Sequence, residues 1–229
     1  MTVPGKNAYH HGNLKRALIE SAAKLMREGA VSQPTVKDLA TDVGVTSAAF
    51  YRHFTSVDEL LAAARIEGLE LFEAAERAAL ARAEGDSVSR VEVLIRAYVQ
   101  FAQRHPGHFR IMTDSSVARR PNGNLRNRPA LGLVVDAIAD GLRRGEITKG
   151  NPKDFAIAAW AAVHGLAGLF AYGPLRDVLD NRKSRAKQLE DVLIGLICRG
   201  LSASPDQLAR PARQLKTRKQ PDLNERRDR

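Results

Sequence analysis

The sequence is poor in cysteine and in aromatic residues, and both shortages narrow the possible fold classes. Its 229 residues include one cysteine, Cys198, which excludes an internal disulfide and any multi-cysteine metal or iron–sulfur site. Aromatic residues make up 5%, and no stretch alternates apolar with polar residues, so a β-rich fold is disfavoured. No charged segment followed by an apolar segment opens the chain, and we therefore expect a cytoplasmic protein.

The sequence also lacks the motifs of common catalytic sites. It has no Gly-rich phosphate loop and no nucleophile elbow. The pair His105 and His108 has only Pro106 and Gly107 between its members and no carboxylate close in sequence, which makes a poor metal site. We therefore expect no enzymatic activity, no catalytic residue, no metal site and no cofactor.

Positive charge, by contrast, is abundant. Lys and Arg number 36 against 26 Asp and Glu, a formal net charge of +10, which favours phosphate-bearing partners. Residues 206–229 hold 8 of these basic groups against 4 acidic ones and show no apolar repeat, so we expect a basic, disordered tail. Residues 1–61 contain 7 basic and 6 acidic groups, so any specific phosphate site there depends on where individual residues lie.

The periodicity of the apolar residues is helical almost throughout. Leu14, Leu18, Ala22 and Leu25 recur every three or four residues, with basic residues between them. Ser56 and Glu59 form a capping-box pattern at the start of the longest expected helix. We predict an all-α fold of about nine helices, over residues 14–28, 36–43, 47–53, 57–82, 88–104, 106–112, 130–144, 152–172 and 184–201.

One segment is long and apolar enough to cross a membrane. Residues 155–172 carry no formal charge over 18 positions, which meets the length requirement. Seven of these residues are alanine, however, and His164 lies near the middle. We predict that this helix is buried on all sides within the protein and that the chain has no membrane span.

Residues 35–53 have the pattern of a helix-turn-helix. Thr35 is a suitable N-cap for the first helix, Gly44 can end it in the left-handed conformation, and Thr46 can cap the second. Such a unit presents its second helix to the DNA major groove. The predicted outward side chains on that helix are Ser47, Ala48, Ala49, Tyr51, Arg52 and His53.

The chemistry of these side chains fits a DNA duplex. Ser47, Ala48 and Ala49 are small enough to bring the backbone near base edges, and alanine methyls can pack on thymine methyls. Tyr51 and His53 are suited to phosphate oxygens. The same spacing also occurs in ordinary helical bundles, where Tyr51 would be a buried core residue.

Several motifs resemble those of TetR/AcrR-family transcriptional regulators. The most specific is Leu39-Ala40-x-x-x-Gly44-Val45 followed by Phe50-Tyr51-x-His53-Phe54 and Glu59-Leu60-Leu61. The opening Tyr9-His10-His11-Gly12-Asn13-Leu14 and the later Trp160-x-x-x-His164-Gly165 resemble one subset of the family, which has a Trp-His-Gly motif in its carboxy-terminal domain. The resemblance covers residues 9–72 strongly and residues 88–201 more weakly.

The resemblance implies a homodimeric regulator, most commonly a repressor, that binds operator DNA and is released by a small molecule. It implies a DNA-binding domain at 9–60, a dimerisation and effector-binding domain at 61–204, and the tail at 205–229. Thr35 and Lys37 then face phosphates, and Thr46, Ser47, Ala48 and Ala49 face bases or backbone. The family usually has Lys where this chain has Val57, and Lys6 or the His10-His11 arm is a candidate to replace that phosphate contact.

The resemblance further implies an effector pocket enclosed by the fifth to eighth helices. The expected effector is largely apolar, with one polar group near His164. Plain core packing is the alternative for every residue assigned to this pocket. The candidate lining residues are Tyr98, Phe101, Phe109, Met112, Trp160 and His164.

A different class of protein also fits the charge pattern. Residues 119–128 contain four arginines and no acid, and the tail is basic as well. A basic all-α module could bind RNA or an anionic membrane through these segments without sequence specificity. A footprint with a repeated half-site on DNA would distinguish the regulator from this alternative.

Overall fold

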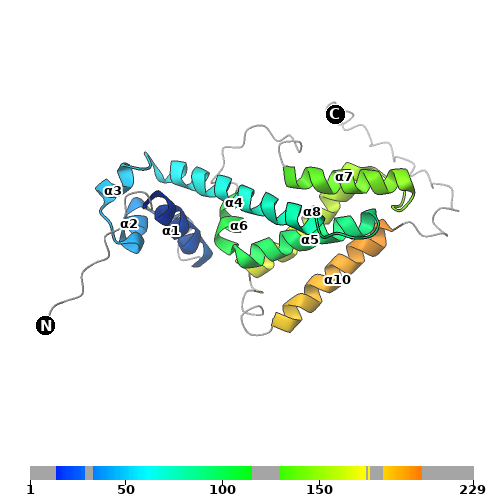
Figure 1. Ribbon diagram of the computed structural model, residues 1–229. Helices are drawn as coiled ribbons and strands as arrows, with labels where there is room; N and C mark the ends of the chain where they lie inside the picture. Colours follow the sequence, from blue (N-terminus) through cyan, green and yellow to red (C-terminus); the bar gives the residue numbers. More distant parts are fainter. Residues whose placement is uncertain (1–13, 29–32, 115–128, 174, 176–182, 203–229) are drawn as a thin grey trace, which may run out of the picture.

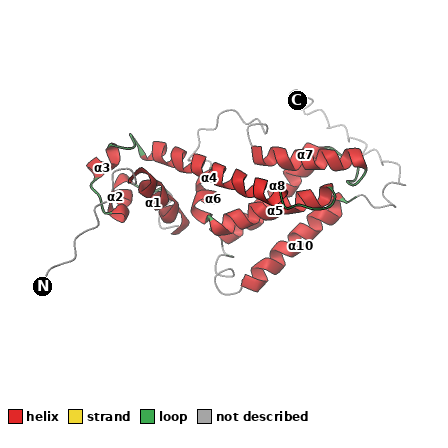
Figure 2. Cartoon of the chain, in the orientation of Figure 1, coloured by secondary structure: helices red, strands yellow, loops and turns green. Residues whose placement is uncertain are grey.

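In the computed structural model, the chain is described over residues 14–28, 33–114, 129–173, 175 and 183–202. These residues form nine helices and no strand, apart from an isolated bridge between Ile147 and Ser202 (Figure 2). The all-α prediction is therefore confirmed for the described part. The Tyr9–Asn13 motif, the arginine-rich 119–128 segment and the 205–229 tail lie outside it.

The first three helices form a small head at one end of the molecule (Figure 1). They are α1 (Leu14–Glu28), α2 (Val36–Val43) and α3 (Ser47–Tyr51). The first turns of α4 (Val57–Leu80) complete the head, because their apolar side chains share its core. The largest fully buried side chains of this core are Leu18, Met26, Leu39, Phe50, Leu60, Leu61 and Ile111.

The rest of α4 continues into a larger body of helices (Figure 1). The body contains α5 (Ser87–Arg104), α6 (Pro106–Thr113), α7 (Pro129–Arg144), α8 (Pro152–Ala171) and α10 (Lys183–Leu201). Helix α5 is central, since it packs against α4, α7, α8 and α10. One long helix thus belongs both to the head and to the body.

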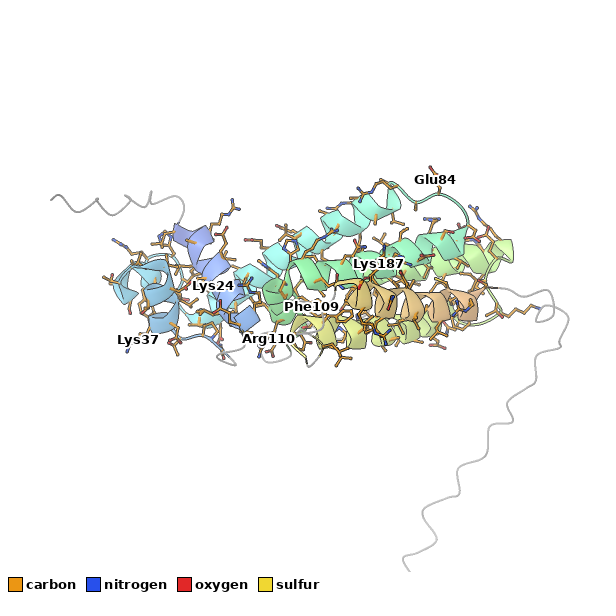
Figure 3. All side chains as sticks on the ribbon, turned by 90° about the horizontal axis from the view of Figure 1, so that it is seen from below. Lys24, Lys37, Glu84, Phe109, Arg110 and Lys187 are labelled. Atoms are coloured by element: carbon orange, nitrogen blue, oxygen red, sulfur yellow. The ribbon has the colours of Figure 1, made fainter. Side chains whose placement is uncertain are left out.

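Helix α6 makes the second connection between head and body. It packs against α1 and α4, and its Gly107 lies directly on the backbone of α1. The guanidinium of Arg110 donates a hydrogen bond of 2.9 Å to the carbonyl of Met26 at the end of α1. Figure 3 shows Phe109 and Arg110 at the junction between head and body.

The helix starts follow the predicted caps, with one difference. The Thr35 hydroxyl accepts from the Asp38 backbone N–H while the Asp38 carboxylate accepts from the Thr35 N–H, a reciprocal capping box. At α4 the Ser56 hydroxyl accepts from the Glu59 N–H as predicted. The Glu59 carboxylate, however, accepts from the N–H and hydroxyl of Thr55, one residue earlier than the box predicts.

Helix α8 is the one described helix that is long and apolar enough to span a membrane, but it lies in the bundle against α5, α7 and α10. The prediction that it is buried on all sides is wrong. Ile157, Ala161, Gly165 and Leu169, spaced four apart, are exposed along one face. The periodicity did not reveal this, because alanine and glycine fit a buried face and an exposed face equally well.

Candidate nucleic-acid interface and ligand cavity

The helix-turn-helix predicted for residues 35–53 is present. Gly44 has φ 76°, in the left-handed region, where a residue without a Cβ ends α2 at little cost. Thr46 then caps α3, its hydroxyl accepting from the Ala49 N–H at 3.2 Å. Helix α3 ends at Tyr51, two residues short of the predicted end at His53.

Fewer of the predicted side chains on α3 are exposed than expected. Ser47, Ala48 and Tyr51 are exposed, Tyr51 at 58%, and His53 just after the helix is half-buried. Ala49 is 5% exposed and belongs to the core of the head, so the prediction that it faces outward is wrong. Because the Ala49 methyl is packed within the head, it is no longer a candidate for contact with a thymine methyl.

Two of the residues predicted to face phosphates, Thr35 and Lys37, lie at the start of α2. Lys37 is exposed on α2, and Figure 3 shows it at the outer end of the molecule, far from Phe109. Both donors of Thr35, its N–H and its hydroxyl, are bound to the Asp38 carboxylate at 2.9 and 2.7 Å. Thr35 therefore fixes the start of α2 and has no donor left for a phosphate, whereas the ammonium of Lys37 can reach one.

Packing explains why position 57 holds valine and not the lysine that the resemblance leads us to expect. Val57 is the first residue of α4 and is half-buried against the core of the head. A side chain that packs there contributes to the stability of the head and not to phosphate binding.

A cavity of about 260 Å³ lies in the body beside α4. Its size is near the lower end of the ~300–1,000 Å³ usual for small-molecule sites. Four predicted residues line it, namely Tyr98, Met112, Trp160 and His164. Apolar lining comes mainly from Leu69, Phe72, Leu94, Ile95, Leu131 and Val134.

Tyr98, Trp160 and His164 form one polar cluster on this wall. The Tyr98 hydroxyl oxygen lies 2.7 Å from His164 Nδ1, and Trp160 Nε1 donates to the same oxygen at 3.4 Å. The indole N–H can only donate, so the Tyr98 oxygen accepts from it and its own hydrogen is available for His164 Nδ1.

Phe101 and Phe109 do not line the cavity, so their assignment to it is corrected. Both are almost fully buried and pack with Phe72, which does line the cavity, in an aromatic cluster behind its wall. The Phe109 ring meets the Tyr98 ring edge-on at 5.5 Å between centroids. These rings support Tyr98 and do not face the space where a ligand would lie.

The cavity contains ionisable groups that the sequence reasoning did not place there. Arg65, Glu73 and Glu76 of α4 line it, together with Asp114 after α6. Glu76 follows Leu61, Ala64, Gly68 and Phe72 along the buried row of α4. The sequence shows this pattern: an acidic residue continues the three- and four-residue spacing of apolar residues along α4, which predicts that Glu76 is buried.

Glu76 is the most unusual of these groups. It is 2% exposed, and its Oε2 has no hydrogen-bond partner among the described residues. Burial, and then the negative charge of Glu73, raise the pKa of the Glu76 carboxyl to about 8, with Arg77 opposing weakly. The free carboxyl is therefore mostly protonated at pH 7.

Other candidate chemistry is weak in the described residues. They contain no cluster of three or more His, Cys, Asp or Glu able to hold a metal ion. His108 lies 3.5 Å from Glu67, and burial lowers its pKa. Burial has the opposite effect on the Cys198 thiol and raises its pKa to about 11, so little reactive thiolate is present at pH 7.

Comparison with known families finds two matches along the chain. Residues 18–64 match the family model "Bacterial regulatory proteins, tetR family". Residues 91–192 match the model "Tetracyclin repressor-like, C-terminal domain". The first match covers most of the head and the start of α4, and the second runs from within α5 to about the middle of α10.

A curated relative matches about half of this chain. A nucleoid occlusion factor, SlmA, of Aliivibrio fischeri is 36% identical over 120 residues, which are 51% of this chain and 59% of that protein. The chain thus matches less than two thirds of the length of this curated relative.

Two solved structures are similar in fold. A Rhodococcus sp. RHA1 protein of unknown function aligns with a TM-score of 0.65 and 27% identity, over 86% of this chain and 100% of that one. AibR, in complex with isovaleryl coenzyme A and operator DNA, aligns with a TM-score of 0.63 and 19% identity, over 80% of this chain and 97% of that one. At 19% identity the likeness to AibR shows the fold alone.

Proposed function

We propose that this chain, which matches models of the TetR family over residues 18–64 and 91–192, is a sequence-specific DNA-binding repressor of that family that a small molecule releases from its operator. The observation that carries this proposal is the arrangement of α4. Its first turns belong to the core of the head, and its later turns line the cavity. The protein then acts in the cytoplasm, as a regulator and not as an enzyme.

The face of the head that carries α3 is the proposed operator surface. Ser47 and Ala48 are the exposed residues at the start of α3 and read base edges, while Lys37, Tyr51 and His53 bind phosphates. Thr46 keeps its hydroxyl hydrogen for a phosphate, because its oxygen only accepts from Ala49. We further propose that the chain belongs to the subset with a Trp-His-Gly motif, and the position of Trp160 and His164 at the cavity supports this.

The proposed release of operator DNA depends on the distance between the two recognition helices of a dimer. Two recognition helices must lie about 34–36 Å apart to enter successive major grooves on one face of the DNA. A ligand between α4 and α8 displaces α4 and with it the head. The ligand must bind the displaced state more tightly, since equal affinity for both states shifts nothing.

The exposed faces of α8 and α10 are the proposed dimer interface. The row on α8 from Ile157 to Leu169 consists of small and apolar residues, and Val192 and Leu196 on α10 are 59% and 57% exposed. Exposed apolar rows on two adjacent helices are typical of a surface that pairs with another chain.

Leu196→Glu is expected to weaken the dimer at least tenfold, because pairing would bury a carboxylate. Analytical ultracentrifugation over a range of protomer concentrations measures the dissociation constant. Ile66→Glu is the matched control, since Ile66 is equally exposed at 58% but lies on α4, away from α8 and α10. Equal dissociation constants for the two variants would contradict the proposed interface.

Tyr51→Phe and His53→Ala are each expected to weaken binding to operator and to scrambled duplex by a similar factor. Each removes a phosphate contact, which carries no sequence information. Ser47→Ala should instead change the preferred sequence. Fluorescence anisotropy on both duplexes measures the affinities, and a loss confined to the operator would show that Tyr51 or His53 reads bases.

The repressor proposal is tested through Trp160, the single tryptophan of the chain. An operator is first selected from a pool of random duplexes, and two half-sites one helical turn apart, or a multiple, are expected. Titration of candidate effectors should then change Trp160 emission and release the operator over the same concentration range. Selection without a repeated half-site would favour the nonspecific basic module.

A further inference from the structure

We propose that the cavity beside α4 binds an amphipathic cation, a compact apolar molecule whose protonated amine pairs with the carboxylate of Glu76. This inference rests on the proposed function of the cavity as the effector site and specifies the chemical class of the effector.

The first argument is the unmet hydrogen bonding of Glu76. Buried carboxyl groups are normally paired or fully hydrogen-bonded, because removal from water without a partner is costly. Glu76 is 2% exposed, lines the cavity, and has an Oε2 without a partner among the described residues. A cationic ligand that enters the cavity supplies the missing donor and the missing charge.

The second argument is the aromatic lining. Phe72, Tyr98 and Trp160 all contribute to the cavity wall, with the Phe72 and Tyr98 rings edge-on at 5.4 Å between centroids. Aromatic faces attract organic cations as well as apolar groups. The remaining wall, from Leu94, Ile95, Leu131 and Val134, accommodates the apolar part of the ligand.

The third argument is the balance of charge around the cavity. Glu73, Glu76 and Asp114 line it together with Arg65, and Glu73 also pairs with Arg77 at 3.4 Å. The charges of Glu73 and Asp114 are thus offset by those of Arg65 and Arg77, and Glu76, which is mostly neutral in the free cavity, is the acid that can ionise to pair with a bound cation.

Binding of the cation must release a proton. In the free cavity the Glu76 carboxyl, with its pKa of about 8, is mostly neutral at pH 7. The charged groups near it are Glu73 and Arg77 on α4 itself, and Arg65 and Asp114 around the cavity, where His164 is a further titratable group. An ammonium group converts the acid to the carboxylate, so one proton leaves for each ligand bound, and affinity rises between pH 6 and pH 8.

Isothermal titration calorimetry on the full chain tests this inference. The probes are 2-phenylethylamine, 4-phenylbutylamine and 1-naphthylmethylamine, each paired with the alcohol of the same skeleton. At pH 7, in phosphate and in Tris, the best amine is expected to bind about tenfold more tightly than its alcohol. The difference in heat between the two buffers should correspond to release of nearly one proton.

Glu76→Gln should abolish both the preference for the amine and the release of the proton. Glu70→Gln is the matched control, because Glu70 is exposed on the same helix and does not line the cavity. If Glu76→Gln fails to fold, proton release by the unaltered chain still decides the question. Absence of amine binding, equal affinity for the alcohol, or binding without proton release would overturn the inference.

Operator release is measured separately with the same probes, so that the two proposals can fail independently. An amine that binds with proton release but leaves the operator bound supports the ligand class and contradicts ligand-controlled repression. An alcohol that releases the operator while no amine binds supports the repressor and overturns the cationic ligand.

Discussion

Gly107→Ala is expected to lower the free energy of unfolding by about 3 kcal/mol or more, at the upper end of what overpacking costs. A Cβ at Gly107 would lie 1.9 Å from the carbonyl oxygen of Ala23 and 2.5 Å from its carbonyl carbon. These are backbone atoms of α1, so no side-chain rotation relieves the overlap. Helix α6 would have to move off α1, which also loosens the junction of head and body.

Urea unfolding at a fixed protomer concentration measures the effect of this substitution. Gly132→Ala is the control, because a Cβ at Gly132 in α7 meets nothing within 4 Å. Alanine is the better helix former by ~1 kcal/mol, so the control variant is expected to be slightly more stable. A Gly107→Ala protein as stable as the unaltered chain would mean that α1 and α6 are not packed as described.

The helix boundaries of the head could be predicted because local signals determine them. Thr35, Gly44 and Thr46 cap or end helices through groups within four residues, and each is found in that role. Helix α3 shows where such signals are insufficient. It has five residues, too few for the apolar period to define a face, and packing in the head decides that Ala49 points inward.

The ligand cavity could be predicted in part. Trp160 and His164 are spaced one helical turn apart, so a shared face follows from sequence, and Tyr98 joins them from α5. The sequence does not distinguish Phe101 and Phe109 from residues that line the cavity, because an aromatic side chain suits a cavity wall and a core equally well. The acidic groups of α4 become part of the cavity only when α5, α7 and α8 cover them.

Glu76→Gln is expected to raise the stability of the protein by an amount that grows with pH. The unfolded chain releases the Glu76 proton near the ordinary pKa of 4.5, whereas the folded protein keeps it until about 8. Below pH 4.5 both states hold the proton, and the acid costs nothing relative to glutamine. Between these values each pH unit lowers the stability of the unaltered chain by about 1.4 kcal/mol, and above pH 8 the loss is constant.

The difference between Glu76→Gln and the unaltered chain should therefore be small at pH 5 and reach on the order of 3–5 kcal/mol at pH 8. Urea unfolding at pH 5, 6, 7 and 8, at one protomer concentration and without ligand, measures it. The exposed control Glu70→Gln should stay within ~0.5 kcal/mol of the unaltered chain throughout. A difference for Glu76→Gln that does not change with pH would show that the folded protein already holds Glu76 as a carboxylate, with a partner other than a ligand.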